Sequence, residues 1–256
     1  MSPVLIISSH VAASRVGGGA QAAALAGLGV ETILAPTVLF GRHPGLGAPG
    51  GSPVPQDIFE GVLSGVEAAG AFETLGAVVA GYFATPEQVV AAVKAIDRIR
   101  AVNRSAWIVV DPIMGDAGSG LYVGEAVALA LAHDLVPRAD LIAPNAWELE
   151  RLSGLVVAGP ASAMAAAACL GRPTLVSSLD AGADIGVLYT DDRQAWLACH
   201  HRMAQAPKGT GDLLTALFVA AALEGAPIEV ARETAVAAVA EVVAGRRTPV
   251  TLERLR

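Results

Sequence analysis

A glycine-rich turn at residues 208–212 carries the strongest chemical signal in this sequence. The segment reads KGTGD and stands directly before a long apolar pattern with helical spacing. Two glycines that flank a threonine let the backbone turn tightly and aim several N–H groups at one point, and the N-terminus of the following helix adds a partial positive charge. The segment therefore predicts a site that cradles an anion.

Asp212, in the first turn of that expected helix, has two candidate roles. Aspartate often caps helices, so an N-cap is the plain alternative. A carboxylate beside an anion site repels the anion, unless the carboxylate takes a proton from the group that attacks that anion. The combination of carboxylate and cradle therefore favours phosphoryl transfer.

Two more groups of oxygen ligands follow predicted strands. The segment Asp111–Asp116 (DPIMGD) comes after the apolar run Trp107–Val110, and Asn145 and Glu148 come after the run Leu141–Ala143. Ligands of open parallel sheets bind beyond the carboxyl ends of the strands. A simple turn would also explain the first group, and a helix capping box would explain the second. Together with the cradle, these two groups predict a site for a magnesium–nucleotide complex.

The elements that must position these residues alternate along the chain. Short apolar runs, typical of strands buried on both faces, are separated by longer stretches with helical spacing, which predicts an α/β fold with helices on both faces of a mostly parallel sheet. The expected strands are Val4–Ser8, Val30–Ala35, Ala77–Ala80, Trp107–Val110, Leu141–Ala143, Thr174–Ser177, Gly186–Tyr189 and Gln194–Ala198. The expected helices are Gly19–Leu28, Ile58–Ala69, Pro86–Val102, Glu125–His133, Ala146–Leu152, Ala161–Leu170, Asp212–Glu224 and Pro227–Ala244.

The segment Gly41–Pro55 breaks this alternation, because it is rich in glycine and proline and has no hydrophobic period. It is either a disordered connector or a flap over a binding site. No repeat or linker divides the chain, so we expect residues 1–256 to form a single domain.

Composition argues against nucleic-acid and membrane partners. The net charge is −7 and no basic cluster occurs. The chain is 54% hydrophobic, yet its longest uncharged stretch, Leu152–Gly171, is interrupted by glycine and proline, and the N-terminus has no cationic leader. The two cysteines, Cys169 and Cys199, lie far apart in the sequence and indicate a reducing compartment, for which the cytoplasm is the simplest choice.

Other common sites are not indicated by the sequence. There is no Walker A lysine motif, and the three glycines Gly17–Gly19 do not open a dinucleotide fingerprint. The histidines and cysteines lack zinc-ligand spacing, and no G-x-S-x-G elbow is present.

The order and spacing of several segments resemble those of the pyridoxal kinases of the ribokinase-like superfamily, from residue 4 to about residue 244. The more specific elements are Ser9-His10-Val11 and Val38-x-Phe40-x-x-His43, whereas Gly209-Thr210-Gly211-Asp212 occurs throughout the superfamily. The other matching segments are Gly81-Tyr82, Asp111–Asp116, Asn145–Glu148 and Ser177-Ser178.

The resemblance implies a three-layer αβα fold and transfer of the ATP γ-phosphate to the 5′-hydroxymethyl group of pyridoxal, pyridoxine or pyridoxamine. It implies that Asp212 is the base and that Gly209, Thr210 and Gly211 stabilise the transferred phosphoryl group. It further implies Mg²⁺, a monovalent cation such as K⁺, and a homodimer. Expected metal contacts are Asp111, Asp116 and Glu148; expected nucleotide contacts are Asp111, Glu148, Ser177, Lys208 and the 209–211 turn; expected substrate contacts are Ser9, Val38, Phe40, His43, Tyr82, Tyr122 and Asp212.

The flap departs from the family pattern. Pro44 stands where family members carry a substrate-contacting threonine, and proline has no N–H to donate. Another small ring alcohol is therefore an alternative acceptor. Lys208 is also unusual for the family, and it is either a solvated charge or an added phosphate contact. A hydroxymethylpyrimidine kinase, which typically has cysteine in place of Asp212, a ribokinase-type sugar kinase and a non-catalytic vitamer-binding protein remain alternatives.

Overall fold

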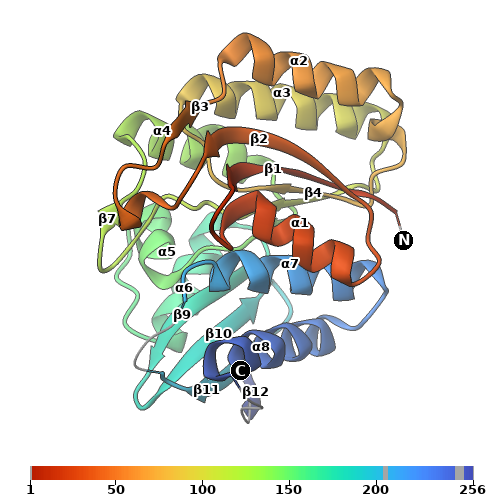
Figure 1. The fold of residues 1–256 in the computed structure, drawn as a ribbon. Helices are drawn as coiled ribbons and strands as arrows, with labels where there is room; N and C mark the ends of the chain where they lie inside the picture. The colour runs from red at the N-terminus through yellow and green to blue at the C-terminus, as the bar shows by residue number, and fades with distance from the viewer. Residues whose placement is uncertain (1, 204–206, 246–250, 256) are drawn as a thin grey trace.

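A ten-stranded sheet forms the centre of the molecule (Figure 1), in the order β12-β11-β10-β9-β8-β5-β4-β1-β2-β3. The computed structural model describes residues 2–203, 207–245 and 251–255, with the backbone alone for the last range. The ends of the expected 1–256 domain and residues 204–206 lie outside this description. The strands of the sheet are β1 Val4–Val11, β2 Thr32–Phe40, β3 Gly51–Pro53, β4 Ala77–Ala80, β5 Trp107–Val110, β8 Leu141–Ile142, β9 Thr174–Ala181, β10 Asp184–Thr190, β11 Ala195–His201 and β12 Thr251–Leu255.

The central strands β2, β1, β4, β5, β8 and β9 are parallel, whereas β3 at one edge and β10, β11 and β12 at the other are antiparallel. The carboxyl ends of the parallel strands therefore meet along one edge of the sheet, as expected for this fold class. A separate two-stranded hairpin, β6 Gly115–Asp116 with β7 Gly120–Leu121, lies in the loop after β5.

Helices cover both faces of the sheet and make a three-layer αβα molecule, which confirms the predicted fold class. Alternate residues of β1 explain the continuous apolar run, because Leu5 and Ile7 face one helical layer while Val4 and Ile6 face the other. One layer contains α2 Gln56–Ala68, α3 Pro86–Val102, α4 Glu125–Ala130, α5 Ala146–Ser153 and α6 Pro160–Leu170. The other contains α1 Gly17–Gly27, α7 Thr210–Leu223 and α8 Ile228–Ala244.

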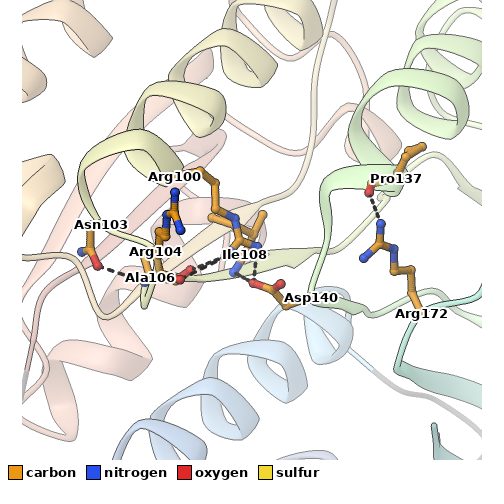
Figure 2. Close-up of polar contacts among 8 residues, drawn as sticks. All are labelled: Arg100, Asn103, Arg104, Ala106, Ile108, Pro137, Asp140 and Arg172. Carbon is orange, nitrogen blue, oxygen red and sulfur yellow. Dashed lines mark hydrogen bonds and ion pairs between the residues drawn. The ribbon is translucent and has the colours of Figure 1, made fainter. Parts of the chain in front are cut away.

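The amino-terminal edge of the sheet, opposite the predicted site, is tied together by Asp140 (Figure 2). Its Oδ2 accepts hydrogen bonds from Arg100 Nη2 of α3 at 2.5 Å and from the Ile108 amide of β5 at 2.8 Å. Asn103, at the end of α3, donates to the carbonyls of Phe72 and Leu75. These contacts fix α3 against the sheet.

The segment Gly41–Pro55 is ordered, so the connector interpretation was wrong. It contains a 3₁₀ turn at Pro44–Leu46 and the edge strand β3, which pairs with the end of β2. Gly51 has φ +92°, and a Cβ there would lie 2.0 Å from the Leu39 carbonyl oxygen, so only glycine allows this pairing.

The end of one helix also differs from the sequence-based expectation. The helix expected over Glu125–His133 ends at Ala130, and a π turn at Leu131–Leu135 follows it. Proline at position 137 cannot continue the helix, because it lacks an N–H donor.

Within the described ranges, no helix is both long enough and apolar enough to cross a bilayer.

Candidate active site

The glycine-rich turn begins α7 in a conformation that only glycine tolerates. Gly209 is the N-cap with φ +90°, and a Cβ there would lie 2.0 Å from the Arg15 carbonyl oxygen. Thr210 and Gly211 form the first helical residues, so their amides have no partner within the helix. The N-terminus of α7 therefore presents a row of N–H groups at the carboxyl-terminal edge of the sheet.

Asp212 does not cap α7, so the N-cap alternative is wrong. Its Oδ2 instead accepts a hydrogen bond of 2.8 Å from the Gly17 amide at the start of α1. Its Oδ1 is buried and has no partner among the described residues. Burial raises the pKa of Asp212 to about 6, although the bond from Gly17 lowers it. A carboxylate with unused acceptor sites and a pKa near neutrality suits a general base.

Ser9 lies on the other side of Gly17 from Asp212. A Cβ on Gly17 would be only 1.9 Å from Ser9 Oγ, and the Gly17 φ of +60° also favours glycine. Gly17 is therefore the point at which the end of β1 and the start of α7 meet. The structure thus brings together Ser9 and the 209–212 turn, which are about two hundred positions apart in sequence.

Asp111 lies at the end of β5 and faces the same region. Its Oδ2 accepts a hydrogen bond of 2.9 Å from Thr215 Oγ1, one turn after the start of α7. Burial raises the pKa of Asp111 well above its ordinary value, and the negative charges of Asp212 and Glu148 raise it further. Three carboxylates therefore lie close enough to repel one another in a buried setting, which favours a cation among them.

Glu148 has the capping role that the sequence predicts, and it has a second role as well. Asn145 and Glu148 form a complete capping box at the start of α5. Glu148 Oε1 also accepts hydrogen bonds from the amides of Met114 at 2.8 Å and Gly115 at 3.3 Å. Burial raises the pKa of Glu148 to about 7, even though these backbone bonds lower it. Glu148 therefore holds the 111–116 loop in place.

Asp116 is engaged by its own hairpin. Its Oδ1 accepts hydrogen bonds from the amides of Gly118 and Ser119, and its Oδ2 accepts one from the Tyr122 hydroxyl. Lys208 Nζ lies 3.6 Å from the same Oδ2. Partial burial raises the pKa of Asp116, but these hydrogen bonds and the Lys208 charge outweigh burial and lower it overall. Asp116 and Tyr122 thus form a rim of the site with Lys208.

A direct three-ligand metal centre is not present: within the described ranges no three histidine, cysteine, aspartate or glutamate side chains are arranged to hold a metal ion. Mg²⁺ commonly keeps several waters and takes only one or two carboxylates together with substrate phosphates. The repelling pair Asp111 and Glu148 fits that mode of binding.

The expected substrate walls come from β2, the flap and the loop after β4. Val38 is buried, whereas Phe40, His43 and Tyr82 are half-buried. His43 caps the 3₁₀ turn through Nδ1, which accepts from the Gly45 amide at 3.0 Å. Burial and then the Lys208 charge lower the pKa of His43, so the flap lies near the turn that precedes α7.

Tyr82 is fixed by its backbone. Its amide donates to Ser8 Oγ at 3.1 Å, and its carbonyl accepts from Thr37 Oγ1 at 2.7 Å. Burial raises the pKa of the Tyr82 phenol. This network connects the carboxyl ends of β1, β2 and β4.

Ser177 lies next to the Asn145 segment, since its amide donates to the Pro144 carbonyl at 3.0 Å. The next residue, Ser178, has φ +58°, which no other described residue except glycine shares. It lies where the pairing of β9 with β10 shifts register. A residue with strained backbone at a shift of strand register is typical of a functional site.

Sequence reasoning missed three residues that hold the site together: Gly17, Ser14 and Thr215. Gly17 supplies the amide on Asp212, Thr215 donates to Asp111, and Ser14 Oγ accepts from the His43 amide at 3.2 Å. The three consecutive glycines at 17–19 were the one signal in the sequence that could have identified the first of these.

Comparisons with known proteins agree with this geometry. The family model described as phosphomethylpyrimidine kinase matches residues 74–251. The pyridoxine/pyridoxal/pyridoxamine kinase of Bordetella avium is 37% identical over 238 residues, which are 90% of this chain and 80% of that protein.

Solved structures agree as well. The pyridoxal kinase of Entamoeba histolytica has a TM-score of 0.91 at 25% identity, covering 99% of this chain and 100% of that one. The Leishmania donovani pyridoxal kinase in complex with ADP has a TM-score of 0.89 at 25% identity, covering 94% and 86%. Since a family model spans most of the chain and a relative is 37% identical across most of both proteins, this chain belongs to the pyridoxal kinase family of the ribokinase-like superfamily.

Proposed function

We propose that this chain transfers the γ-phosphoryl group of ATP to the 5′-hydroxymethyl group of pyridoxal, pyridoxine or pyridoxamine. The observation that carries the proposal is the meeting of Ser9 and Asp212 on the two sides of Gly17. This arrangement places the Ser9 hydroxyl, a polar contact for the acceptor ring, next to the Asp212 carboxylate and the N-terminus of α7. The named activities of its relatives support the same reaction.

In this reaction the Asp212 carboxylate takes the proton of the acceptor hydroxyl. The hydroxyl oxygen forms a bond to the γ-phosphorus, the bond between that phosphorus and the β,γ-bridging oxygen breaks, and ADP leaves. The amides of Gly209, Thr210 and Gly211 stabilise the charge that spreads over the transferred group. Asp212 Oδ1 is buried, which limits the access of water to the proton transfer.

The nucleotide lies across the same edge of the sheet. Asp111 would hold Mg²⁺ with the ATP phosphates, and Glu148 and Asp116, whose oxygens accept backbone hydrogen bonds, would contact it through water. Bound Mg²⁺ would neutralise charge on the β- and γ-phosphates. Ser177 and Lys208 would add further phosphate contacts, and Lys208 Nζ, 3.6 Å from Asp116 Oδ2, would bring a positive charge to this rim of the site.

The acceptor ring lies between the flap and the end of β1. Ser9 Oγ bonds the ring, and the pocket walls are Val38, Phe40, His43, Tyr82 and Tyr122. His43 Nδ1 is occupied by the Gly45 amide, which leaves Nε2 to face the acceptor.

The wider setting follows from the family and from the composition. We infer a homodimer, a monovalent cation such as K⁺ beside Mg²⁺, a cytoplasmic location, and no nucleic-acid or membrane partner. The pI of about 5.2 supports the last of these. Sedimentation of the purified protein should give the mass of two 25.8 kDa chains.

A hydroxymethylpyrimidine kinase is the second candidate, because the matching family model carries that description. The presence of Asp212 in place of cysteine favours the vitamin B6 reaction. A non-catalytic vitamer-binding protein would keep the pocket without turnover.

A coupled ATP-consumption assay with pyridoxal, pyridoxine, pyridoxamine, hydroxymethylpyrimidine and ribose tests the proposal. We expect turnover with at least one B6 vitamer to exceed turnover with hydroxymethylpyrimidine and with ribose. Preference for hydroxymethylpyrimidine would support the second candidate, and no turnover with any of the five acceptors would support the binding protein.

A further inference from the structure

Gln21 is a buried polar side chain that the proposed mechanism does not use. It lies on α1 and is 0% exposed, and neither its Oε1 nor its Nε2 has a partner in the described part of the chain. Buried polar atoms are nearly always hydrogen-bonded, so two unpartnered atoms on one amide require an explanation.

Gln88 shows how unusual this is. Gln88 is also 0% exposed, yet its Nε2 donates to the carbonyls of Thr37 and Val54, and its Oε1 accepts from the Ala84 amide. Burial of a glutamine in this protein therefore does not by itself leave the amide without partners.

The position of Gln21 places it beside the base. The buried face of α1 consists of Gly17, Gly18, Gln21 and Leu25, so Gln21 lies one turn after Gly17 on the same face. Helical side chains lean toward the N-terminus of their helix and cover the preceding turn. In α1 that turn consists of three glycines and Ala20, so this helix places only small residues between Gln21 and the end where the Gly17 amide binds Asp212.

A buried oxygen without a hydrogen bond also lies on the neighbouring helix α7. Asp212 Oδ1 is buried without a hydrogen bond in the described residues, while its Oδ2 is held by Gly17. Leu25 of α1 and Phe218 of α7 belong to one apolar cluster, so the unpartnered atoms of Gln21 and Asp212 lie on two helices of the same layer, each within about one turn of the helix start. Buried polar atoms of this kind are satisfied either by an ordered water or by a direct hydrogen bond.

We propose that Gln21 is a positioning residue for Asp212, joined to Oδ1 through Nε2 directly or through one ordered water. The Gly17 amide and the Gln21 amide then hold one oxygen each. A carboxylate has about four lone-pair sites, so the remaining ones face the acceptor hydroxyl. This proposal rests on the proposed role of Asp212 as the base.

The test compares the wild-type enzyme with Gln21→Met, which keeps the length and volume of the side chain and removes its hydrogen-bonding groups. We expect kcat to fall about two- to tenfold, the range that one hydrogen bond supplies, with the KM for ATP unchanged. A glutamine that serves only packing would give unchanged kcat, because methionine fills nearly the same volume.

A matched control is Asn103→Leu at the opposite edge of the sheet. Asn103 is a buried amide that donates to two carbonyls, so its loss lowers the melting temperature without changing kcat. If Gln21→Met retains wild-type kcat while Asp212→Asn loses turnover, the Gln21 proposal is overturned and the base assignment stands. If Asp212→Asn also keeps turnover, the base assignment fails and the Gln21 proposal fails with it.

A crystal structure of the wild-type protein provides a second readout. We expect Gln21 Nε2 and Asp212 Oδ1 to lie within hydrogen-bond distance of each other or of one shared water. A Gln21 amide that is bonded to other groups, with no link to Asp212, would overturn the proposal.

Discussion

At the scale of single residues, the site depends on buried acids whose charges are only partly compensated. Asp111, Glu148 and Asp212 all have raised pKa values, each mainly because of burial. Clusters of this kind are common at catalytic centres, because the shifted groups can exchange protons or bind cations near neutral pH. The two acids of the 111–148 pair are suited to a cation, and Asp212 is suited to proton transfer.

Asp212→Asn tests the base assignment. The amide keeps the shape of the side chain but cannot take a proton, so we expect turnover to fall about 10²–10⁴-fold, the scale of general-base catalysis. The melting temperature should be retained or should rise, because a buried charge is removed. Steady-state kinetics with pyridoxal and ATP, beside calorimetry of both proteins, measure the two effects. Equal rates for variant and wild type would remove Asp212 from the mechanism.

The same acids predict how stability depends on pH. Glu148 has a pKa of about 7 when folded against an ordinary value of 4.5, so between these pH values the native state binds more protons than the unfolded state. The free energy of unfolding therefore falls as pH rises through this window, by on the order of 3 kcal/mol from Glu148 alone, and Asp111 and Asp212 act in the same direction.

Chemical denaturation of the ligand-free protein at pH 5 and pH 8 checks this sign. Mg²⁺ should restore stability at pH 8, where the carboxylates are charged, and have little effect at pH 5. Glu148→Gln should reduce the slope. Greater stability at pH 8 than at pH 5, without metal, would contradict the arrangement of buried acids described above.

Pro44 gives a prediction about the acceptor. It occupies the first position of the 3₁₀ turn that His43 caps, where it donates no hydrogen bond. Pro44→Thr adds an N–H and a hydroxyl beside the expected ring, so we expect a lower KM for pyridoxal with kcat little changed. The measurement is a substrate titration with both proteins. An unchanged KM would place Pro44 away from the acceptor.

At the scale of elements, the start of α7 combines two glycines with different requirements. Gly209 is left-handed and would clash with the Arg15 carbonyl if it carried a Cβ. Gly211 lies inside the helix, and a Cβ there would meet no other atom within 4 Å. Gly209 is therefore needed for the fold, whereas Gly211 leaves open space over the turn that forms the anion cradle.

Alanine at each position separates these roles. Gly209→Ala should lower the free energy of unfolding by about 2 kcal/mol or more, because the cost of a left-handed backbone and the cost of the clash with the Arg15 carbonyl add together. Gly211→Ala should raise it by about 0.5–1 kcal/mol, because alanine is the better helix former. The KM for ATP should rise in Gly211→Ala if its Cβ enters the phosphate site. Thermal unfolding and ATP titrations of both variants give the comparison.

The strand pairing in the flap could not be predicted from the sequence of the flap alone. Glycine and proline correctly predicted irregular backbone at 41–55, but the edge pairing of β3 with β2 depends on Leu39 and Phe40, which lie outside the segment. The hairpin β6–β7 was missed for a related reason. Its strands have two residues each and carry no periodic pattern.

At the scale of the whole molecule, the parallel core was predictable because each of its strands is an apolar run bounded by polar turns. The position of the candidate site at the carboxyl-terminal edge followed from that topology. The bonds from Gly17 to Asp212 and from Thr215 to Asp111 were not predictable, since they join segments with no shared pattern. Strand β12 was also missed, because its five residues, TLERL, include two charged residues and do not form an apolar run.

The bond between Gly17 and Asp212 spans 195 positions of the chain. During synthesis, the first helix leaves the ribosome long before the aspartate that its amide must hold. A prematurely terminated product that stops before residue 212 would contain Ser9 and the flap but would lack Asp212, the proposed base. We therefore expect such fragments to be inactive. The amount of phosphorylated vitamer would then measure only the chains whose translation has passed residue 212.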